Sequence, residues 1–351
     1  MRYHRPASAV AILVSVLGVS TALPAAPAAP SAAPSYKITK SVPLGGADGW
    51  DYLYFEPHSH RVYVSHSTEI TVVDGHSGDI VGRVQGLSGV NGVTAIPELG
   101  KGYTDSRARK AAVAFDLNSF TATKDIPADV DTDGLIYDPA TRRIFLMNGD
   151  GMDATVIDAT NDQALANIPL QGKPEYLVSD NAGHVYINIT DKREIVRLDA
   201  RALKIDARWP IPQCEGPHGL AMDRQSHRLF ASCVNKQLVV VDARNGKVVA
   251  TLPIGRGTDA AAFDPKRKLV FSSNGEGTLS IISEQGPDKF VSMGEVQTKP
   301  FARTMALDPE SGRIYLVTAE LDELNPQAEN LRQRYAIRRG TVQLLFLDPS
   351  S

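Results

Sequence analysis

Cysteine, tryptophan and long apolar runs are scarce in this chain of 351 residues, which holds two cysteines and two tryptophans. Two cysteines in so long a chain cannot build a disulfide-based fold, although they allow one bridge. After the N-terminal segment no stretch approaches 18 consecutive apolar residues, so no membrane-spanning helix is expected. Charge of one sign is not in excess either, because 37 basic residues stand against 40 acidic ones. This balance gives no electrostatic reason to expect nucleic acid as the main partner.

Short catalytic signatures are also missing. The chain has no nucleophile elbow, phosphate-binding loop or haem-attachment motif.

The N-terminus has the three-part layout of a secretory signal peptide. Arg2 and Arg5 precede the nearly apolar stretch of residues 7–19, and small residues at 20–22 offer a cleavage site. We therefore expect a signal peptide over residues 1–22, an Ala/Pro-rich leader over 23–35 and a periplasmic or secreted protein. Loss of the two arginines would change the net charge from −3 to about −5.

One pattern repeats throughout the rest of the chain. An aromatic residue opens one short apolar stretch of each copy, and an acid closes the next. The aromatics are 40 to 44 residues apart, at Tyr63, Tyr103, Phe145, Tyr186, Phe230, Phe271 and Tyr315. The closing acids are 41 to 43 apart, at Asp74, Asp116, Asp158, Asp199 and Asp242; Ser283 and Asp348 take this place in the last two copies. Two markers with one period indicate a repeat architecture.

Each copy reads as four short strands separated by turn residues. In the fifth they are expected over residues 219–222, 228–232, 237–242 and 248–253. The third is a continuous β-branched run, typical of a sheet that is covered on both faces. Blades stacked around an axis provide that cover, so residues 36–351 are expected to form one seven-bladed β-propeller domain rather than an open stack of repeats. The seventh copy stops at its third strand, and residues 36–44 should supply the missing fourth strand and close the ring.

Two copies carry a family resemblance. Tyr63-Val64-Ser65-His66 and Tyr315-Leu316-Val317-Thr318, with Val-x-Asp in the strand that follows the first and Asp-Pro before the second, resemble the YVTN repeat of bacterial periplasmic and surface propellers. The resemblance spans about residues 36–348 and implies the propeller fold. It implies binding or surface roles, with nucleic-acid and metal-linked roles suggested for some members. Similar propellers include lactonases and lyases, so the fold does not select a chemistry.

Alignment of the copies places seven polar residues at one position, the start of each innermost strand. They are Asp51, Asn91, Asp133, Glu175, His218, Asp259 and Arg303, spaced 40 to 44 residues apart. We expect them to surround the mouth of the central channel. They either form a hydrated ring that pairs with itself, as Arg303 could with Asp259 and Asp51, or hold a ligand. Four carboxylates and one guanidinium sum to −3 at this orifice.

Three of these residues come from consecutive blades and could meet. Glu175, His218 and Asp259 offer carboxylate oxygens and one imidazole. This set suits Ca²⁺, Mg²⁺ or Mn²⁺ and suits Zn²⁺ less well. The sequence has no local pair of metal-binding histidines, so the cation site is one alternative beside a plain polar lining.

The ends of the second strands add further polar residues near the same face: His66, Asp105, Asn148, Asn188, Asn235 and Asn274. Turn formation explains most of them, because Asn and Asp tolerate loop conformations. His66 and His218 could also act as acid–base groups. Cys214 and Cys233 map to this face of the fifth blade and are expected to form a disulfide, with free thiols or a metal site as the alternatives.

The seventh copy contains an insertion within residues 321–340. From its aromatic to its closing acid are 33 residues, compared with 11 to 13 in the earlier copies. A helix over residues 327–337 is possible after Pro326. The insertion carries Arg332, Arg334, Tyr335, Arg338 and Arg339. It is either a solvated surface loop or a lid whose cationic arm meets an anionic ligand or the acidic ring.

The leading functional prediction is a monomeric exported binding or scaffold propeller that holds a small-molecule or protein ligand at the mouth. A metal-assisted hydrolase, lactonase or lyase at the same place is the alternative. Single-stranded nucleic-acid binding ranks third, because only Trp50, Tyr335 and the arginines of the insertion offer stacking and positive charge.

Overall fold

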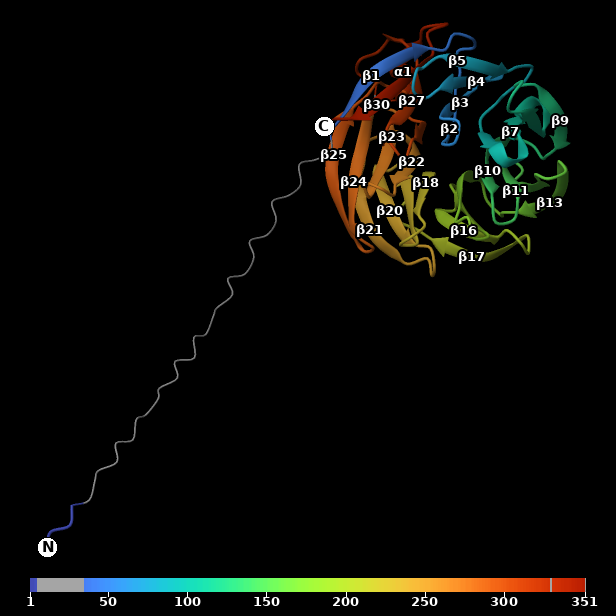
Figure 1. Ribbon diagram of the computed structural model, residues 1–351. Coiled ribbons are helices and arrows are strands. Elements are labelled where there is room, and N and C mark those ends of the chain that lie inside the picture. The colour runs from blue at the N-terminus through green and yellow to red at the C-terminus, as the bar shows by residue number, and fades with distance from the viewer. Residues whose placement is uncertain (5–34, 329, 351) are drawn as a thin grey trace. The chain divides into compact units, whose positions relative to one another are not determined.

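The computed structural model describes residues 1–4, 35–328 and 330–350. Most of the predicted signal peptide and leader lies outside the described residues. From residue 35 on, the strands form seven four-stranded antiparallel sheets arranged as a ring (Figure 1). This part of the chain is a seven-bladed β-propeller, as the repeat predicts.

Each blade contains four strands, and the first strands of neighbouring blades contact one another around the channel. The first strands are β2 (Leu53–Glu56), β6 (Val93–Ile96), β10 (Thr132–Asp138), β14 (Pro174–Ser179), β18 (Pro217–Asp223), β22 (Thr258–Asp264) and β26 (Met305–Leu307). The second strands are β3 (Arg61–His66), β7 (Lys101–Ser106), β11 (Arg143–Asn148), β15 (His184–Ile189), β19 (Arg228–Cys233), β23 (Leu269–Asn274) and β27 (Ile314–Thr318).

The outer half of each blade contains the remaining two strands. The third strands are β4 (Glu69–Asp74), β8 (Ala111–Asp116), β12 (Asp153–Asp158), β16 (Glu194–Asp199), β20 (Gln237–Asp242), β24 (Thr278–Gly286) and β30 (Gln343–Pro349). The fourth strands are β5 (Ile80–Val84), β9 (Ala122–Pro127), β13 (Gln163–Pro169), β17 (Lys204–Pro210), β21 (Val248–Pro253), β25 (Lys289–Gln297) and β1 (Tyr36–Pro43). Two short 3₁₀ helices, η1 (Pro97–Leu99) and η2 (Arg107–Arg109), lie in the second blade.

The ring is closed by the two ends of the repeat region. Strand β1 pairs antiparallel with β30, from Tyr36 opposite Pro349 to Pro43 opposite Gln343. In Figure 1 the blue β1 lies directly beside the red β30. The seventh blade therefore combines three C-terminal strands with one N-terminal strand, and the predicted closure is confirmed.

The two repeat markers meet at the boundary between blades. The hydroxyl of Tyr315 donates to the carbonyl of Gly75, 3.0 Å away, and that of Tyr103 donates to the carbonyl of Ala159 at 3.1 Å. Both carbonyls directly follow a closing acid. The acids themselves cap the next turn, as where Asp74 accepts from the backbone N–H of His76 at 2.9 Å. All seven marker aromatics are buried in the apolar clusters between neighbouring blades, including Phe145, Phe230 and Phe271, which have no hydroxyl. The aromatic marker therefore recurs because every blade boundary packs around such a ring.

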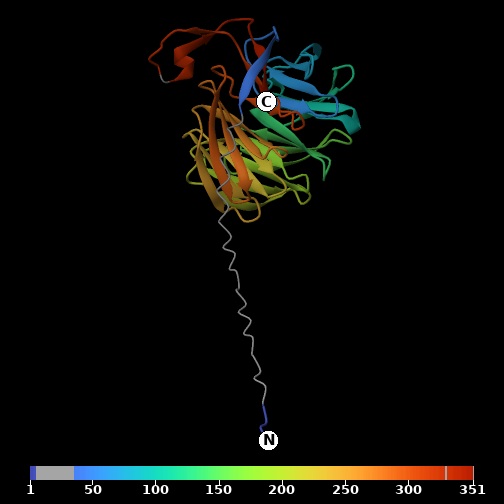
Figure 2. The ribbon, with the colours of Figure 1, turned by 60° about the vertical axis from the view of Figure 1, so that its left-hand side comes forward.

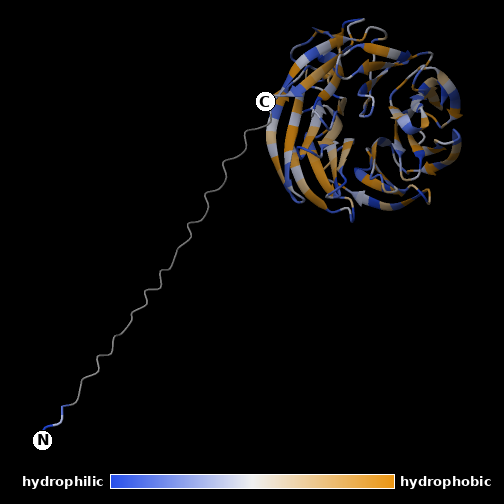
Figure 3. Cartoon of the chain, viewed as in Figure 1, coloured by the Kyte–Doolittle hydropathy of each residue, from blue (hydrophilic) through white to orange (hydrophobic). Residues whose placement is uncertain are grey.

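The core is divided among the seven blade boundaries. Each of seven clusters of buried apolar side chains combines residues of two neighbouring blades, including the pair formed by the last blade and the first. Figure 3 shows the hydrophobic residues along the strands and the hydrophilic residues mainly in the loops between them. Since every cluster needs two blades, no blade buries its faces alone.

The insertion of the seventh blade folds differently from the prediction. Its helix α1 covers only Leu331–Arg334, and Tyr335–Ile337 forms strand β29, which pairs with β28 (Leu321–Glu323). The predicted helix over residues 327–337 is therefore wrong, because pairing with β28 takes up the backbone of its last part. Figure 2 shows the red insertion standing out at one end of the propeller. Among the described residues, no helix is long and apolar enough to cross a membrane.

Candidate functional site

The ring of polar residues is produced by irregular pairing at the start of the first strands. In four blades the pairing between the first and second strands shifts next to the ring residue, at Asp133, Glu175, His218 and Asp259. Asp51, Asn91 and Arg303 each lie two residues before the first strand of their blade. A bulged residue leaves the regular ladder and its side chain is re-aimed. The ring residues therefore lie outside the regular strand pairing, at the mouth of the channel.

Three ring residues come together as the sequence predicts. Ligand atoms of Glu175, His218 and Asp259 all lie within 4.8 Å of one another. Glu175 Oε1 is 3.6 Å from His218 Nε2, and Asp259 Oδ2 is 3.1 Å from Arg303 Nε. The trio is partly shielded from solvent, with Asp259 only 5% exposed. This arrangement can hold a divalent cation, although Arg303 already contacts one oxygen of Asp259.

The hydrogen bond of His218 decides which of its ring nitrogens can act as a ligand. Its Nδ1 lies 2.9 Å from the carbonyl oxygen of Gly216. A carbonyl oxygen only accepts, so Nδ1 carries the proton and a neutral ring presents the lone pair of Nε2 to Glu175. A lone pair and a carboxylate oxygen repel unless a proton or a cation lies between them. The geometry of His218 therefore favours a positive charge at this point.

Burial and like charges raise the pKa values of the ring carboxyls. Burial raises the pKa of Asp51 well above its ordinary value, and the carboxylate of Asp259 raises it further while Arg303 opposes the change. Burial, then Asp51 and Glu175, raise the pKa of Asp133. For Glu175, burial raises the pKa and His218 lowers it. The ionised ring is therefore costly, and proton or cation uptake would relieve it.

The Asp51→Asn variant should reveal this cost. A carboxyl group whose pKa is higher in the folded than in the unfolded protein favours folding while it is protonated. This contribution to the free energy of unfolding is complete below the unfolded-state pKa of about 3.9, and it is lost as the pH rises through the folded-state pKa. We expect the variant to match the wild type in thermal unfolding at about pH 4 and to be more stable at about pH 8.

The control is Asp116→Asn, which removes a turn carboxyl whose pKa is lowered by hydrogen bonds from Ser119. This variant should be less stable than the wild type at about pH 8, whereas Asp51→Asn should be more stable. A loss of stability in Asp51→Asn that grows with pH would contradict the interpretation.

In Asn91, another ring member, the side-chain amide nitrogen already donates two hydrogen bonds. Its Nδ2 donates to Asp105 Oδ2 at 3.1 Å and to the carbonyl of Thr132 at 2.9 Å. Asp105 also accepts from the backbone N–H groups of Asn91 and Gly92, both at 2.8 Å. Burial raises the pKa of Asp105 to about 7 against these hydrogen bonds, which lower it. Asn91 and Asp105 form a buried polar link between blades.

The other residues at the ends of the second strands hold strands and loops in place. Asn235 lies in the turn after β19, as the turn interpretation predicts. The other five lie within the second strands themselves: His66, Asp105, Asn148, Asn188 and Asn274. Asn188 Nδ2 donates to the carbonyl of His218 at 2.7 Å, and Asn235 Nδ2 donates to the carbonyl of Gln213 at 2.9 Å. His66 is buried beside Ala47 and Glu69 and is not part of the trio. Asn188 and Asn235 therefore support the segment that carries His218, whereas Asn148 and Asn274 bond within their own blades.

A disulfide lies on the same segment. The structure joins Cys214 to Cys233 with their Cα atoms 5.2 Å apart. Cys233 pairs with Pro217, the residue before His218. The bridge thus ties the loop that enters the fifth blade to the end of its second strand.

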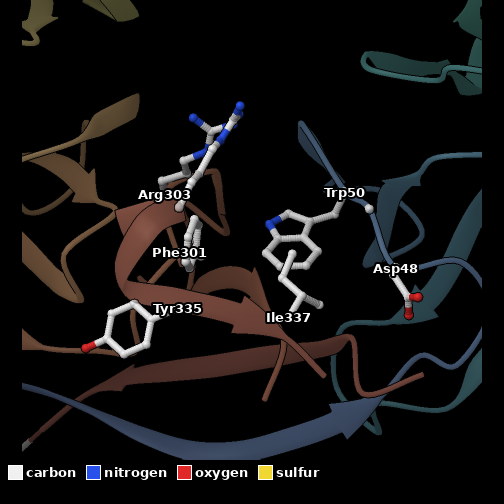
Figure 4. Close-up of a pocket in the computed structure, with 8 residues that line it drawn as sticks. Asp48, Trp50, Phe301, Arg303, Tyr335 and Ile337 are labelled. Carbon is white, nitrogen blue, oxygen red and sulfur yellow. The ribbon is translucent and has the colours of Figure 1, made fainter. Parts of the chain in front are cut away.

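Beside the ring, the insertion of the seventh blade covers a pocket of about 340 Å³. Its lining consists of Asp48, Gly49, Trp50, Phe301, Arg303, Arg332, Tyr335 and Ile337. In Figure 4 the indole of Trp50 lies close to Ile337, with Phe301, Tyr335 and Arg303 on the other side. Arg303 belongs both to this pocket and to the ring. Phe301 carries no repeat marker, and only its place two residues before Arg303 could have pointed to it.

Fewer charged residues of the insertion face the pocket than the sequence predicts. Arg334 pairs with Glu323 at 2.7 Å, and Arg338 pairs with Glu320 and Asp322 at 2.7 and 2.6 Å. Arg339 is almost fully exposed and lies 3.9 Å from Asp48. Of the five predicted residues of the insertion, only Arg332 and Tyr335 line the pocket. The remaining arginines mainly neutralise acids of the insertion or beside it.

Comparison with known proteins supports the fold alone. No protein-family model matches the chain, and no curated protein matches its sequence. Hydrazine synthase from Kuenenia stuttgartiensis is similar in structure, with a TM-score of 0.68 and 13% sequence identity over 84% of this chain and 96% of that one. At this identity the likeness shows a shared propeller fold and no shared chemistry. The YVTN resemblance rests on the sequence motifs.

Proposed function

We propose that this protein is an exported binding propeller that holds a ligand at the channel mouth, with a divalent cation bound by Glu175, His218 and Asp259 as part of that site. The observation that carries the proposal is the position of His218 Nε2, which lies 3.6 Å from Glu175 Oε1 with a third potential ligand, Asp259, beside them. Oxygen-rich sites of this kind suit Ca²⁺, Mg²⁺ or Mn²⁺. Export is proposed from the N-terminal segment.

Calorimetric titration with Ca²⁺, Mg²⁺, Mn²⁺ and Zn²⁺ tests the cation site. His218→Ala and Glu175→Gln should each weaken binding by at least about tenfold, because even partners of metal ligands contribute that much. Affinity should also fall on acidification, since protons compete for the imidazole and the carboxylates.

Asp133→Asn is the matched control, because it removes a ring carboxylate outside the trio and should change affinity much less. Equal affinities in the wild type and in both trio variants would show that the ring is only a polar lining. Elemental analysis of exported protein purified without chelator would identify the bound metal.

A metal-assisted hydrolase, lactonase or lyase is the second candidate. It is favoured by the fixed tautomer of His218, whose Nε2 could exchange a proton beside Glu175. Turnover of simple lactones or esters that requires added cation and is lost in His218→Ala would support it. Cation binding without turnover would favour the binding role. Single-stranded nucleic-acid binding is opposed by the acidic ring and by the ion pairs of Arg334 and Arg338.

A further inference from the structure

We propose that the pocket under the insertion of the seventh blade binds a small molecule with a flat apolar body and a carboxylate group. The proposal names the ligand class of the mouth and therefore rests on the proposed function. The pocket's volume of about 340 Å³ is within the range of small-molecule sites. It is built from three segments far apart in the chain: residues 48–50, residues 301–303 and the insertion.

Three of the eight residues that line the pocket are aromatic. Trp50, Phe301 and Tyr335 line it together with Ile337. Phe301 and Tyr335 contact each other edge to face, with ring centroids 6.3 Å apart and planes at 74°. Trp50 packs on the hydrophobic cluster between the seventh and first blades, which supports its indole from behind. Rigid aromatic faces of this kind bind planar apolar groups by stacking and edge contacts.

The backbone at Phe301 is strained in a way that shapes this wall. Its φ is +62°, in the left-handed region that a bulky residue seldom adopts. Hydrogen bonds from Phe301 N to the Gly275 carbonyl, 2.7 Å, and from Arg303 N to the Phe301 carbonyl, 2.8 Å, hold this turn. The turn places Phe301 and Arg303 in the same pocket.

Two guanidinium groups give the pocket its charge preference. Arg332 forms no ion pair with any carboxylate among the described residues, unlike its neighbours Arg334 and Arg338. Arg303 faces Asp259 through Nε, and its side chain is 38% exposed. Asp48 also lines the pocket, but its Oδ1 accepts a hydrogen bond from the backbone N–H of Gly340 at 2.6 Å and its Oδ2 lies 3.9 Å from Arg339 Nε. Two guanidinium groups against this one carboxylate leave the lining with a net positive charge.

These charges decide between two kinds of aromatic-site ligand. An aromatic cage also suits a quaternary ammonium ion, but two arginines in one small pocket repel a cation. A carboxylate instead receives two parallel N–H bonds from a guanidinium group. Charge and shape together favour a planar carboxylate over a cation or a neutral molecule.

Four probes separate these contributions in calorimetric titration: cinnamate, the neutral cinnamamide, the aliphatic hexanoate and phenyltrimethylammonium. We expect cinnamate to bind with a dissociation constant of about 10 µM to 1 mM, the range for so small a ligand. Cinnamamide and hexanoate should each bind roughly tenfold more weakly, because one lacks the charge and the other the ring. Binding of phenyltrimethylammonium as tightly as cinnamate would overturn the proposal.

Two variants and a matched control locate the site. Arg332→Gln should weaken cinnamate by roughly tenfold or more and leave cinnamamide nearly unchanged. Trp50→Leu should weaken both, provided that its thermal unfolding shows a folded protein. Arg338→Gln changes an arginine of the same insertion whose partners, Glu320 and Asp322, do not line the pocket, and it should have little effect. Equal losses in Arg332→Gln and Arg338→Gln, or no binding of cinnamate to the wild type, would overturn the proposal.

The same preparations distinguish failure of this proposal from failure of the proposed cation site. Arg332→Gln should bind the divalent cation as the wild type does, because Arg332 is not one of the trio. Cation binding without cinnamate binding would leave the cation site standing and reject the pocket. Cinnamate binding without cation binding would reject the cation site and leave the pocket standing.

Discussion

A protein that lacks residues 35–45 should be largely unfolded or aggregated at room temperature. The deletion removes β1 and with it seven residue pairs to β30. It also removes the buried side chains of Tyr36, Val42 and Leu44. At about 1.5–3 kcal/mol for each buried apolar side chain, the loss is about 5–9 kcal/mol. That is comparable to the whole free energy of unfolding of a typical domain, about 5–15 kcal/mol.

The deletion would also leave β30 as an unpaired edge whose apolar residues 344–347 are buried in the intact protein. Such an edge promotes aggregation. Thermal unfolding and size-exclusion chromatography measure the effect. A synthetic peptide of residues 35–45 should restore part of the stability, and Lys37→Ala, which changes an exposed residue of β1, should not lower it. Cooperative unfolding of the truncated protein at the wild-type temperature would refute the role of β1.

Replacement of both cysteines, in Cys214→Ala/Cys233→Ala, should lower the free energy of unfolding by about 3 kcal/mol. The bridge spans 19 residues of sequence, and closing a loop of about this length removes that much conformational entropy from the unfolded chain. For a domain of this size we expect a fall in melting temperature of about 5–10 °C. Both side chains are fully buried among apolar residues, so alanine avoids placing a hydroxyl in the core.

Reducing agent provides the control for this variant. It should lower the melting temperature of the wild type toward that of the variant and leave the variant unchanged. Cation affinity should fall as well, because the bridge holds the loop that leads to His218. Non-reducing peptide mapping of the purified protein that recovers both cysteines as free thiols would show that the disulfide does not form.

The propeller was predictable because its evidence is spread along the chain. The marker aromatics recur at one period since each is buried between its own blade and a neighbouring one. Closure was predictable because a strand was missing at one end of the repeat and spare at the other. The trio of Glu175, His218 and Asp259 followed from the same alignment, since equivalent positions of consecutive blades must lie side by side.

The insertion could not be predicted in this way, because it occurs in one blade only. Local helix signals were overridden by pairing of β29 with β28, and the arginines found partners that no repeat specifies. The same holds for the pocket, whose Trp50, Phe301 and Tyr335 come from three separate segments.

By itself, therefore, the sequence determined the features that every blade shares: the strands, their number, the closing strand and the positions around the channel. These features can be predicted because every copy of the repeat must satisfy the same local packing, so the same residue pattern recurs. Only the tertiary structure decided the features that occur once. The tautomer of His218, the contact of Arg303 with Asp259 and the aromatic pocket depend on distances between particular atoms of different segments. Spacing along the chain places residues on the same face, but packing in three dimensions decides which atoms meet.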